Sequence, residues 1–188
     1  SATGHKVMSD TGIGILYGKK ELLKKMYPAL CGGGAINSVS ENGYEAAGLP
    51  YRFEPGTPHI IGAASLLAAG QYIESIWGYS VMEKYEHSLV EYTLEKIREL
   101  PKSVKLIGPM DASLRLWVFS FSFENHHPRD IADALADAGI CVRAGHHCTE
   151  PLHNHFGLPA SLRMSFYIYN TKQDIDQFIN EMKVLLTK

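Results

Sequence analysis

The sequence predicts an α/β fold whose second half alternates strands with covering helices. Residues 116–123 alternate aromatic with smaller side chains, which is the period-two pattern of a strand. Residues 128–138 and the segment that begins at Thr171 carry apolar residues at helical spacing. Further strands are expected at 140–144 and 161–168. These elements predict a small layered α+β domain.

The helices have recognisable ends. Gly139 ends the helix over 128–138, and Thr171 with Asp174 three residues later is typical of a helix start. Two more helices are expected in the middle of the chain, one over 58–78 and one that ends near Leu100.

The first 57 residues are less regular. We expect a short strand over 12–17, a short helix over 19–25 and a long loop over 31–57 that contains three consecutive glycines. A loop of this length inside a compact domain is either functional or covered by a partner.

The composition excludes several classes of protein. The 188 residues are 45% hydrophobic and 20% charged with a formal net charge of −2, which is typical of a globular chain. There is no basic excess for binding nucleic acid, no apolar run that predicts a membrane span and no signal-peptide pattern. The chain has three cysteines, too few for a disulfide framework and odd in number, so we expect a reducing, cytoplasmic compartment.

Cys148 is the first candidate for chemistry. It ends the run Arg143-Ala144-Gly145-His146-His147-Cys148 and precedes a predicted helix start at Thr149. A thiol near cations at the start of a helix tends toward the nucleophilic thiolate. The alternative is a buried, inert cysteine, which is what we expect of Cys141 inside its strand.

A zinc site is a second hypothesis for the same segment. His146, His147, Cys148, His153 and His155 lie within ten residues, and imidazole and thiolate are zinc ligands. Adjacent His-His-Cys residues cannot readily direct three side chains at one metal, and no second cysteine pair follows. The nucleophile is therefore the favoured hypothesis, and we expect no metal.

Two arginines are candidates for recognising an anion. Strand alternation places Arg163 opposite Leu162 and Met164, and Arg143 opposite Val142. A guanidinium binds a carboxylate or phosphate with two hydrogen bonds. The alternative is a pair of solvated arginines on the sheet face.

Lys6 is the candidate at the other end of the chain, in Thr3-Gly4-His5-Lys6. Lysine forms a Schiff base when an aldehyde cofactor is held against it, although a surface lysine is the default. A reactive lysine is not expected at a poorly ordered terminus, so we expect the chain to be part of a longer protein.

Both ends together resemble a known family. Thr3-Gly4-His5-Lys6, followed by Gly12-Ile13-Gly14-Ile15-Leu16, resembles the pyridoxal-phosphate attachment signature of class V aminotransferases. The segment from Arg143 to Cys148, followed by Pro151-Leu152, is similar to the active-cysteine segment of group II cysteine desulfurases of the SufS type, which include selenocysteine lyases. Between and after these motifs, further residues appear in the family's order: Gly32-Gly33-Gly34, Arg52-Phe53-Glu54-Pro55-Gly56-Thr57-Pro58, Arg163 and Tyr169-Asn170-Thr171.

The resemblance implies a role for each candidate residue. Lys6 binds pyridoxal 5'-phosphate covalently and later moves the Cα proton of the substrate. Thr3 and His5 contact the cofactor phosphate, and Thr57 contacts it from the opposite subunit of a homodimer. Cys148 takes sulfur from L-cysteine as a persulfide and leaves L-alanine. Arg163 holds the substrate carboxylate, with Arg143 beside it.

The resemblance also implies a larger context. The fold is the C-terminal part of a fold-type I pyridoxal-phosphate transferase, with residues 1–57 as the tail of the large domain and 58–188 as the small domain. Cysteine desulfurases of this family supply sulfur for iron–sulfur clusters through acceptor proteins of the SufE or SufU type. Thr3, Thr149 and Glu150 depart from the residues common in the family, which leaves the acceptor open. A selenocysteine lyase, another class V aminotransferase and a non-catalytic assembly domain are the alternatives.

Overall fold

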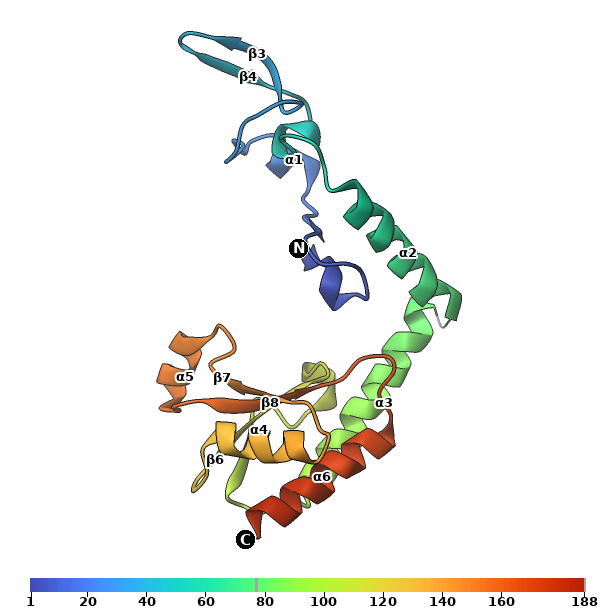
Figure 1. The fold of residues 1–188 in the computed structure, drawn as a ribbon, viewed down its shortest axis with the longest axis vertical. Coiled ribbons are helices and arrows are strands. Elements are labelled where there is room, and N and C mark those ends of the chain that lie inside the picture. The colour runs from blue at the N-terminus through green and yellow to red at the C-terminus, as the bar shows by residue number, and fades with distance from the viewer. Residues whose placement is uncertain (77, 188) are drawn as a thin grey trace. The chain divides into compact units, whose positions relative to one another are not determined.

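The computed structural model describes residues 1–76 and 78–187, and the chain forms two compact units, Ser1–Gly78 and Tyr79–Lys188 (Figure 1). The predicted division into 1–57 and 58–188 concerns the domains of a longer protein and stays a prediction. None of the described helices is long and apolar enough to cross a lipid bilayer.

The first unit consists of short elements and one long helix. Strands β1 (Ala2–Thr3) and β2 (Gly14–Ile15) pair antiparallel and flank the 3₁₀ turn η1 (Gly4–Lys6). Helices α1 (Lys20–Leu23) and α2 (Ile60–Ile76) confirm the helices predicted over 19–25 and 58–78. The strand predicted over 12–17 forms only at its centre.

The prediction of a structureless loop over 31–57 is wrong. This segment contains a β-hairpin, β3 (Ile36–Ser40) with β4 (Gly43–Ala46), and a 3₁₀ turn, η2 (Tyr51–Phe53). Ser40 pairs with Gly43, so Glu41 and Asn42 form a two-residue turn. Asn42-Gly43 marks the turn in the sequence, although Gly43 itself belongs to β4, and the low hydrophobicity of the flanking residues concealed the two strands.

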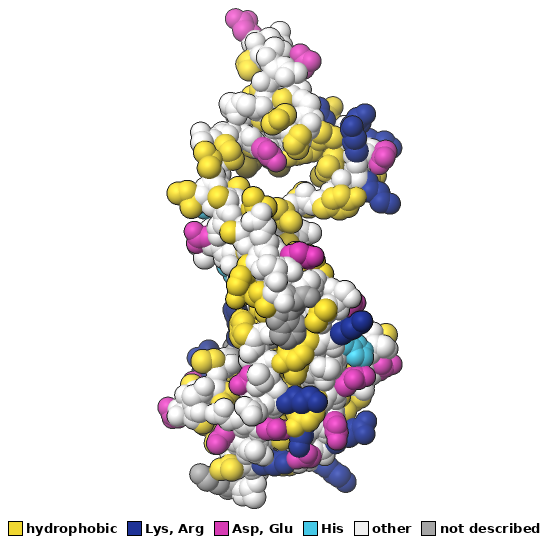
Figure 2. Space-filling model, turned by 90° about the vertical axis from the view of Figure 1, so that its right-hand side faces the viewer, with side chains coloured by type: hydrophobic (Ala, Val, Ile, Leu, Met, Phe, Trp, Pro, Cys, Tyr) yellow, Lys and Arg dark blue, Asp and Glu magenta, His cyan; other side chains and the backbone are white. Residues whose placement is uncertain are grey.

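Large apolar side chains are exposed on the first unit. Figure 2 shows hydrophobic side chains at the surface of its upper part, and the most exposed are Tyr27 at 90%, Tyr17 at 84% and Val39 at 74%. A soluble monomer rarely exposes so much apolar surface in one region. Exposed apolar patches of this kind are typical of surfaces that contact another part of a protein or a partner.

The second unit is a four-stranded antiparallel sheet with helices packed on one face. The strand order is β5-β6-β8-β7. The strands are β5 (Val104–Ile107), β6 (Val118–Phe123), β7 (Arg143–Gly145) and β8 (Ser161–Ser165). The helices are α3 (Tyr79–Ile97), α4 (Pro128–Asp137), α5 (Glu150–Phe156) and α6 (Lys172–Leu186).

The core lies between one face of this sheet and helices α3, α4 and α6. Phe119, Phe121 and Leu162 are fully buried on that face, against Leu135 of α4 and Phe178 of α6. The strand alternation predicted over 116–123 is therefore confirmed over Val118–Phe123, and the predicted start of the last helix is confirmed as well. The Thr171 backbone amide donates to Asp174 Oδ2 at 2.8 Å in a capping box.

Two strand predictions in the second unit need correction, and one strand was missed. Strand β5 was not predicted, and β8 ends at Ser165 because the next residues turn, with the Tyr167 amide donating to Asn170 Oδ1 at 2.9 Å. The strand predicted over 140–144 forms only from Arg143, because β7 lies at the sheet edge and pairs on one side alone. The prediction that Cys141 is buried is consequently wrong, since it is exposed and outside the strand.

Arg115 fixes the connection between β5 and β6, a role that the sequence did not indicate. Its guanidinium donates to the carbonyl oxygens of Pro109 at 2.7 Å, Ile107 at 2.8 Å and Val118 at 3.1 Å. It also lies over the Phe119 ring, 5.0 Å from the centroid. The end of β5 and the start of β6 are thereby tied together beside the polar face of the sheet.

Glu86 is a buried carboxyl group on α3. It is 4% exposed, and its Oε1 has no hydrogen-bond partner. Burial, assisted by the nearby Glu83 carboxylate, raises the pKa of Glu86 to about 7. Because the folded state holds this proton more tightly than the unfolded state, the stabilisation from the protonated form is complete below pH 4.5 and is lost as pH rises through about 7.

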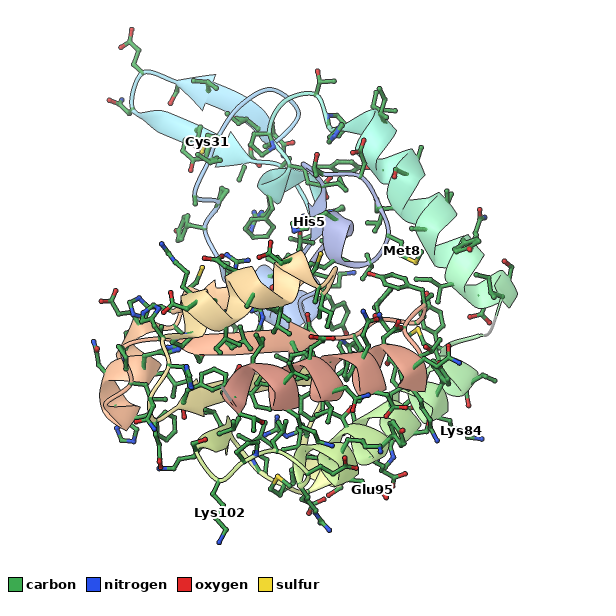
Figure 3. All side chains as sticks on the ribbon, turned by 60° about the horizontal axis from the view of Figure 1, so that its bottom comes forward. His5, Met8, Cys31, Lys84, Glu95 and Lys102 are labelled. Carbon is green, nitrogen blue, oxygen red and sulfur yellow. The ribbon has the colours of Figure 1, made fainter. Side chains whose placement is uncertain are left out.

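We expect Glu86→Gln to stabilise the chain at pH 8 by about 1–3 kcal/mol and to have little effect near pH 4.5. The amide keeps the shape of the protonated acid but cannot ionise. Urea unfolding at both pH values measures the difference. Glu95→Gln is the control, because Glu95 is exposed on the same helix (Figure 3). A Glu86→Gln effect that is equal at both pH values would contradict the assignment of the titrating group.

Candidate active site

Cys148 lies in a tight turn between β7 and α5. The backbone is left-handed at both His147, with φ of 53°, and Cys148, with φ of 62°. The Thr149 amide donates to the His146 carbonyl at 2.8 Å and closes the turn. The Cys148 thiol is free and exposed. Left-handed backbone costs energy for residues other than glycine, so neighbouring contacts must hold this turn.

Thr149 is the N-cap residue of α5, as predicted, and Pro151 lies in its first turn. The Thr149 side chain, however, caps no amide of the helix. Its hydroxyl donates backwards to the His146 carbonyl at 2.7 Å. Thr149 therefore stabilises the turn that carries Cys148 rather than the helix that follows.

Three of the nearby imidazoles bind oxygen atoms of the protein. His146 Nε2 lies 2.8 Å from the Pro159 carbonyl, and His147 Nε2 lies 3.1 Å from both the carbonyl and the hydroxyl of Ser161. His153 Nε2 lies 2.9 Å from the Ser161 hydroxyl. Within residues 1–76 and 78–187, no group of three His, Cys, Asp or Glu side chains is placed to hold a metal ion.

Arg143 and Arg163 face each other across the pair β7–β8. Arg163 also pairs with Ser120 on its other side, and the Arg163 Nε atom is buried without a partner. Among the described residues, no carboxylate forms an ion pair with either guanidinium. Like charges opposite one another on adjacent strands repel. An anion between the two guanidinium groups would relieve this repulsion, and anion binding by Arg143 and Arg163 stays a prediction.

A cavity of about 230 Å³ opens on this polar side of the sheet. Its lining includes Ile107, Val118, Ser120, His147, Leu152 and Arg163. Burial lowers the pKa of His147, and electrostatic interactions with Arg163, His153 and Arg143 lower it further, while the bond to the Ser161 backbone opposes them. A neutral imidazole thus lies beside the guanidinium of Arg163 in one cavity.

Lys6 lies on a well-defined turn in the first unit. The Val7 and Ser9 amides both donate to the Gly4 carbonyl, at 2.9 and 3.1 Å. Gly4 is buried, and a Cβ atom there would lie 2.5 Å from Ile13 Cγ2, so no larger residue fits. The turn is joined to α2 by a hydrogen bond of 3.1 Å between the hydroxyls of Ser9 and Ser65.

The side chains of this turn fit part of the cofactor implied above. Thr3 Oγ1 and His5 Nδ1 are 3.2 Å apart, and Lys6 is exposed beside them (His5 is labelled in Figure 3). A hydroxyl and an imidazole suit phosphate oxygens, and a primary amine suits an aldehyde. Thr57 lies in an exposed bend of the same unit. Cys148, Arg143 and Arg163 all belong to the second unit.

The sequence did not point to Ser161, which is 1% exposed and binds two imidazoles. The sequence suggested a role for His153 only as a ligand in the zinc hypothesis. One signal was present, because residues 149 and 153 are four apart and therefore lie on the same side of a helix. That spacing alone could not show that the His153 imidazole also meets Ser161, because Ser161 lies on the neighbouring strand β8.

Comparison with known proteins places these features in a family. The model of the aminotransferase class-V family matches residues 1–178. A probable cysteine desulfurase of Staphylococcus aureus (strain Mu50) is 44% identical over 97% of this chain. The chain spans only 44% of the length of that relative.

Solved structures agree with the sequence comparison. The apo structure of the cysteine desulfurase of Thermococcus onnurineus is 40% identical and has a TM-score of 0.88 over 98% of this chain and 46% of its own. The S-sulfonic acid form of the Escherichia coli cysteine desulfurase CsdA is 33% identical, with a TM-score of 0.85 over 98% of this chain and 45% of its own. The fold is thus the C-terminal part of the fold of these enzymes, as predicted.

The cofactor of such enzymes is pyridoxal 5'-phosphate. The turn around Lys6 offers side chains that suit this cofactor, and the family match begins at the first residue of the chain and includes that turn. The chain therefore belongs to the class-V aminotransferase family.

Proposed function

We propose that this chain is the C-terminal part of a pyridoxal-phosphate-dependent cysteine desulfurase of group II. The observation that carries the proposal is the position of Cys148 at the end of β7, the strand whose Arg143 faces Arg163. A free, exposed thiol on a left-handed turn thus follows the strand that carries Arg143, and no carboxylate of the described residues forms an ion pair with Arg143 or Arg163. This arrangement suits a substrate that carries both a carboxylate and a sulfur atom.

The residues of the second unit have separate tasks. Arg163 binds the substrate carboxylate, and Arg143 adds a second positive charge. The Cys148 thiolate attacks the substrate sulfur, so an S–S bond forms while the substrate C–S bond breaks. The carbon keeps the electron pair, takes a proton and becomes the methyl group of L-alanine. Cys148 is left as a persulfide for transfer to an acceptor.

The residues of the first unit hold the cofactor. Thr3 and His5 bind its phosphate, Lys6 binds it covalently, and Thr57 reaches the phosphate of the partner subunit in a homodimer. When bound, pyridoxal 5'-phosphate supplies an electron sink that stabilises negative charge on the substrate Cα. The Lys6 amine, once free, carries the Cα proton. The exposed apolar surface of the first unit supports the proposed dimer.

The biological setting is proposed on the same basis. L-cysteine is the substrate, the persulfide passes to an acceptor protein of the SufE or SufU type, and the sulfur supplies iron–sulfur clusters in the cytoplasm. The domains of the longer protein divide at 57/58, so that α2 begins the small domain and the turn around Lys6 belongs to the large one.

The 188-residue chain alone is expected not to produce alanine from cysteine, even with cofactor added. Relatives are more than twice as long, and the family residues that stack on the pyridine ring precede the lysine. Positioning supplies much of the rate in an enzyme. Alanine measured after incubation of the chain with cysteine and pyridoxal 5'-phosphate decides this, and steady turnover would show that the chain is complete as a catalyst.

In the full-length protein, Cys148→Ala should abolish desulfuration and leave the visible absorption of the bound cofactor unchanged, because the thiol acts on sulfur and does not bind the cofactor. Lys6→Ala should instead remove the absorption of the lysine-bound cofactor. Alanine formation and the absorption spectrum measure the two effects. Cys141→Ala is the matched control, since Cys141 is also exposed in the second unit. Normal cysteine turnover by Cys148→Ala would refute its role as nucleophile.

Arg163→Ala should weaken the binding of cysteine tenfold to hundredfold, about 1.5–3 kcal/mol, because it removes a charge-assisted pair of hydrogen bonds. Arg163→Lys keeps the charge but loses the planar geometry, so its loss should be smaller. Cysteine titrations and thermal melts on one preparation separate binding from folding. Unchanged binding in a folded Arg163→Ala protein would place the carboxylate elsewhere.

A further inference from the structure

The turn that carries Cys148 is held by contacts that do not involve Cys148 itself. Two successive residues other than glycine adopt left-handed backbone, at His147 and Cys148. Such a conformation persists only where the surroundings determine it. The contacts that do so come from His146, from Thr149 and, outside the turn, from His153.

His153 is the buried member of this set. It is 5% exposed on α5, and both of its nitrogens have partners. Nδ1 lies 3.1 Å from the Thr149 carbonyl, and Nε2 lies 2.9 Å from the hydroxyl of Ser161 on β8. The imidazole therefore joins the last residue of the turn to the neighbouring strand.

The positions of the protons in this network follow from the atoms that can only accept a hydrogen bond. A carbonyl oxygen only accepts, so the Nδ1–H of His153 donates to Thr149 and the Nε2–H of His147 donates to the Ser161 carbonyl. In neutral His153, Nε2 is then a bare acceptor, and the Ser161 hydroxyl donates to it. The lone pairs of that hydroxyl remain free to accept from His147, 3.1 Å away.

The surroundings of the His153 side chain are largely apolar. Leu152, Phe156 and Leu158 line the same cavity. A buried polar side chain costs free energy unless its hydrogen bonds are satisfied. Among residues 1–76 and 78–187, the hydrogen bonds of His153 run to Thr149 in the Cys148 turn and to Ser161. The contacts of His153 are therefore directed at the turn rather than at the core.

We propose that His153 is a positioning residue for Cys148, and that it acts through Ser161 and the Thr149 carbonyl to hold the turn in its left-handed form. The hydrogen bonds that His153 makes within the described part of the chain run to Thr149 and Ser161, and not to Cys148 or Arg163. The inference rests on the proposed function, because it assigns His153 to the presentation of the nucleophile in that reaction. It predicts a loss of turnover without a loss of substrate binding.

The test compares four variants of the full-length protein with cofactor bound. His153→Leu removes both hydrogen bonds at similar volume, and His153→Gln keeps one donor and one acceptor. Ser161→Ala removes the shared hydroxyl, and the double variant His153→Leu/Ser161→Ala removes both partners. His155→Leu is the matched control, because His155 is exposed on the same helix and contacts the Phe156 ring in an edge-to-face arrangement.

Steady-state kinetics with L-cysteine give the first readout. We expect kcat to fall about tenfold in His153→Leu and in Ser161→Ala, with KM within about twofold, because Arg163 is untouched. His153→Gln should recover kcat to within about threefold of the unmodified protein. The double variant should lose no more than the worse single variant, since both act through one connection.

Amide hydrogen exchange gives a second readout that does not depend on activity. The Thr149 amide, which closes the turn, should exchange about tenfold faster in His153→Leu, with the buried Phe121 of β6 as the internal reference for global stability. His155→Leu should leave both amides unchanged.

The outcomes separate the two proposals. Unchanged kcat and unchanged Thr149 exchange in His153→Leu would overturn the positioning role, as would a Gln variant no better than the Leu variant. If the unmodified full-length protein does not release alanine from cysteine, the proposed function fails. The exchange of the Thr149 amide would then still decide whether His153 holds the turn.

Discussion

The pairing of β7 with β8 is the constraint on which the candidate site depends. Its register places Arg143 opposite Arg163 and Gly145 opposite Ser161. The first pair brings together two positive charges that the described residues leave without a carboxylate. The second pair starts the Cys148 turn beside the hydroxyl that His147 and His153 share. A slip of β7 by one residue would turn Arg143 to the opposite face of the sheet, while Arg163 would stay in place because β8 also pairs with β6.

The burial of the other sheet face makes this arrangement rigid. Phe119, Phe121 and Leu162 have no accessible surface, and they hold β6 and β8 against α4 and α6. Because successive side chains of a strand point to opposite faces, the same packing directs Ser120 and Arg163 to the open face. The apolar core therefore orients Arg163, the candidate anion-binding residue, without contributing a polar atom to the open face.

The open face of the sheet carries buried polar atoms that have no hydrogen-bond partner in the described residues. Arg163 has a buried Nε without a partner, and His147 has a buried Nδ1 without one. Unpaired buried groups cost free energy and are concentrated at functional sites. In a desulfurase, a substrate carboxylate would complete the hydrogen bonding of Arg163. The imidazoles of His146, His147 and His153 have a different task, because they bind the protein's own oxygens around Cys148.

The sequence by itself determined the family, the class of fold, the long helices, and the candidates Lys6, Cys148, Arg143 and Arg163. These features are local: apolar periodicity, capping residues and short motifs are all visible within a few positions. Tertiary structure decided the rest. It decided that Cys141 is exposed, because an edge strand forms only where its single neighbour pairs with it. It also decided that His153 meets Ser161, since a hydrogen bond between a helix and a strand depends on packing that no local pattern records.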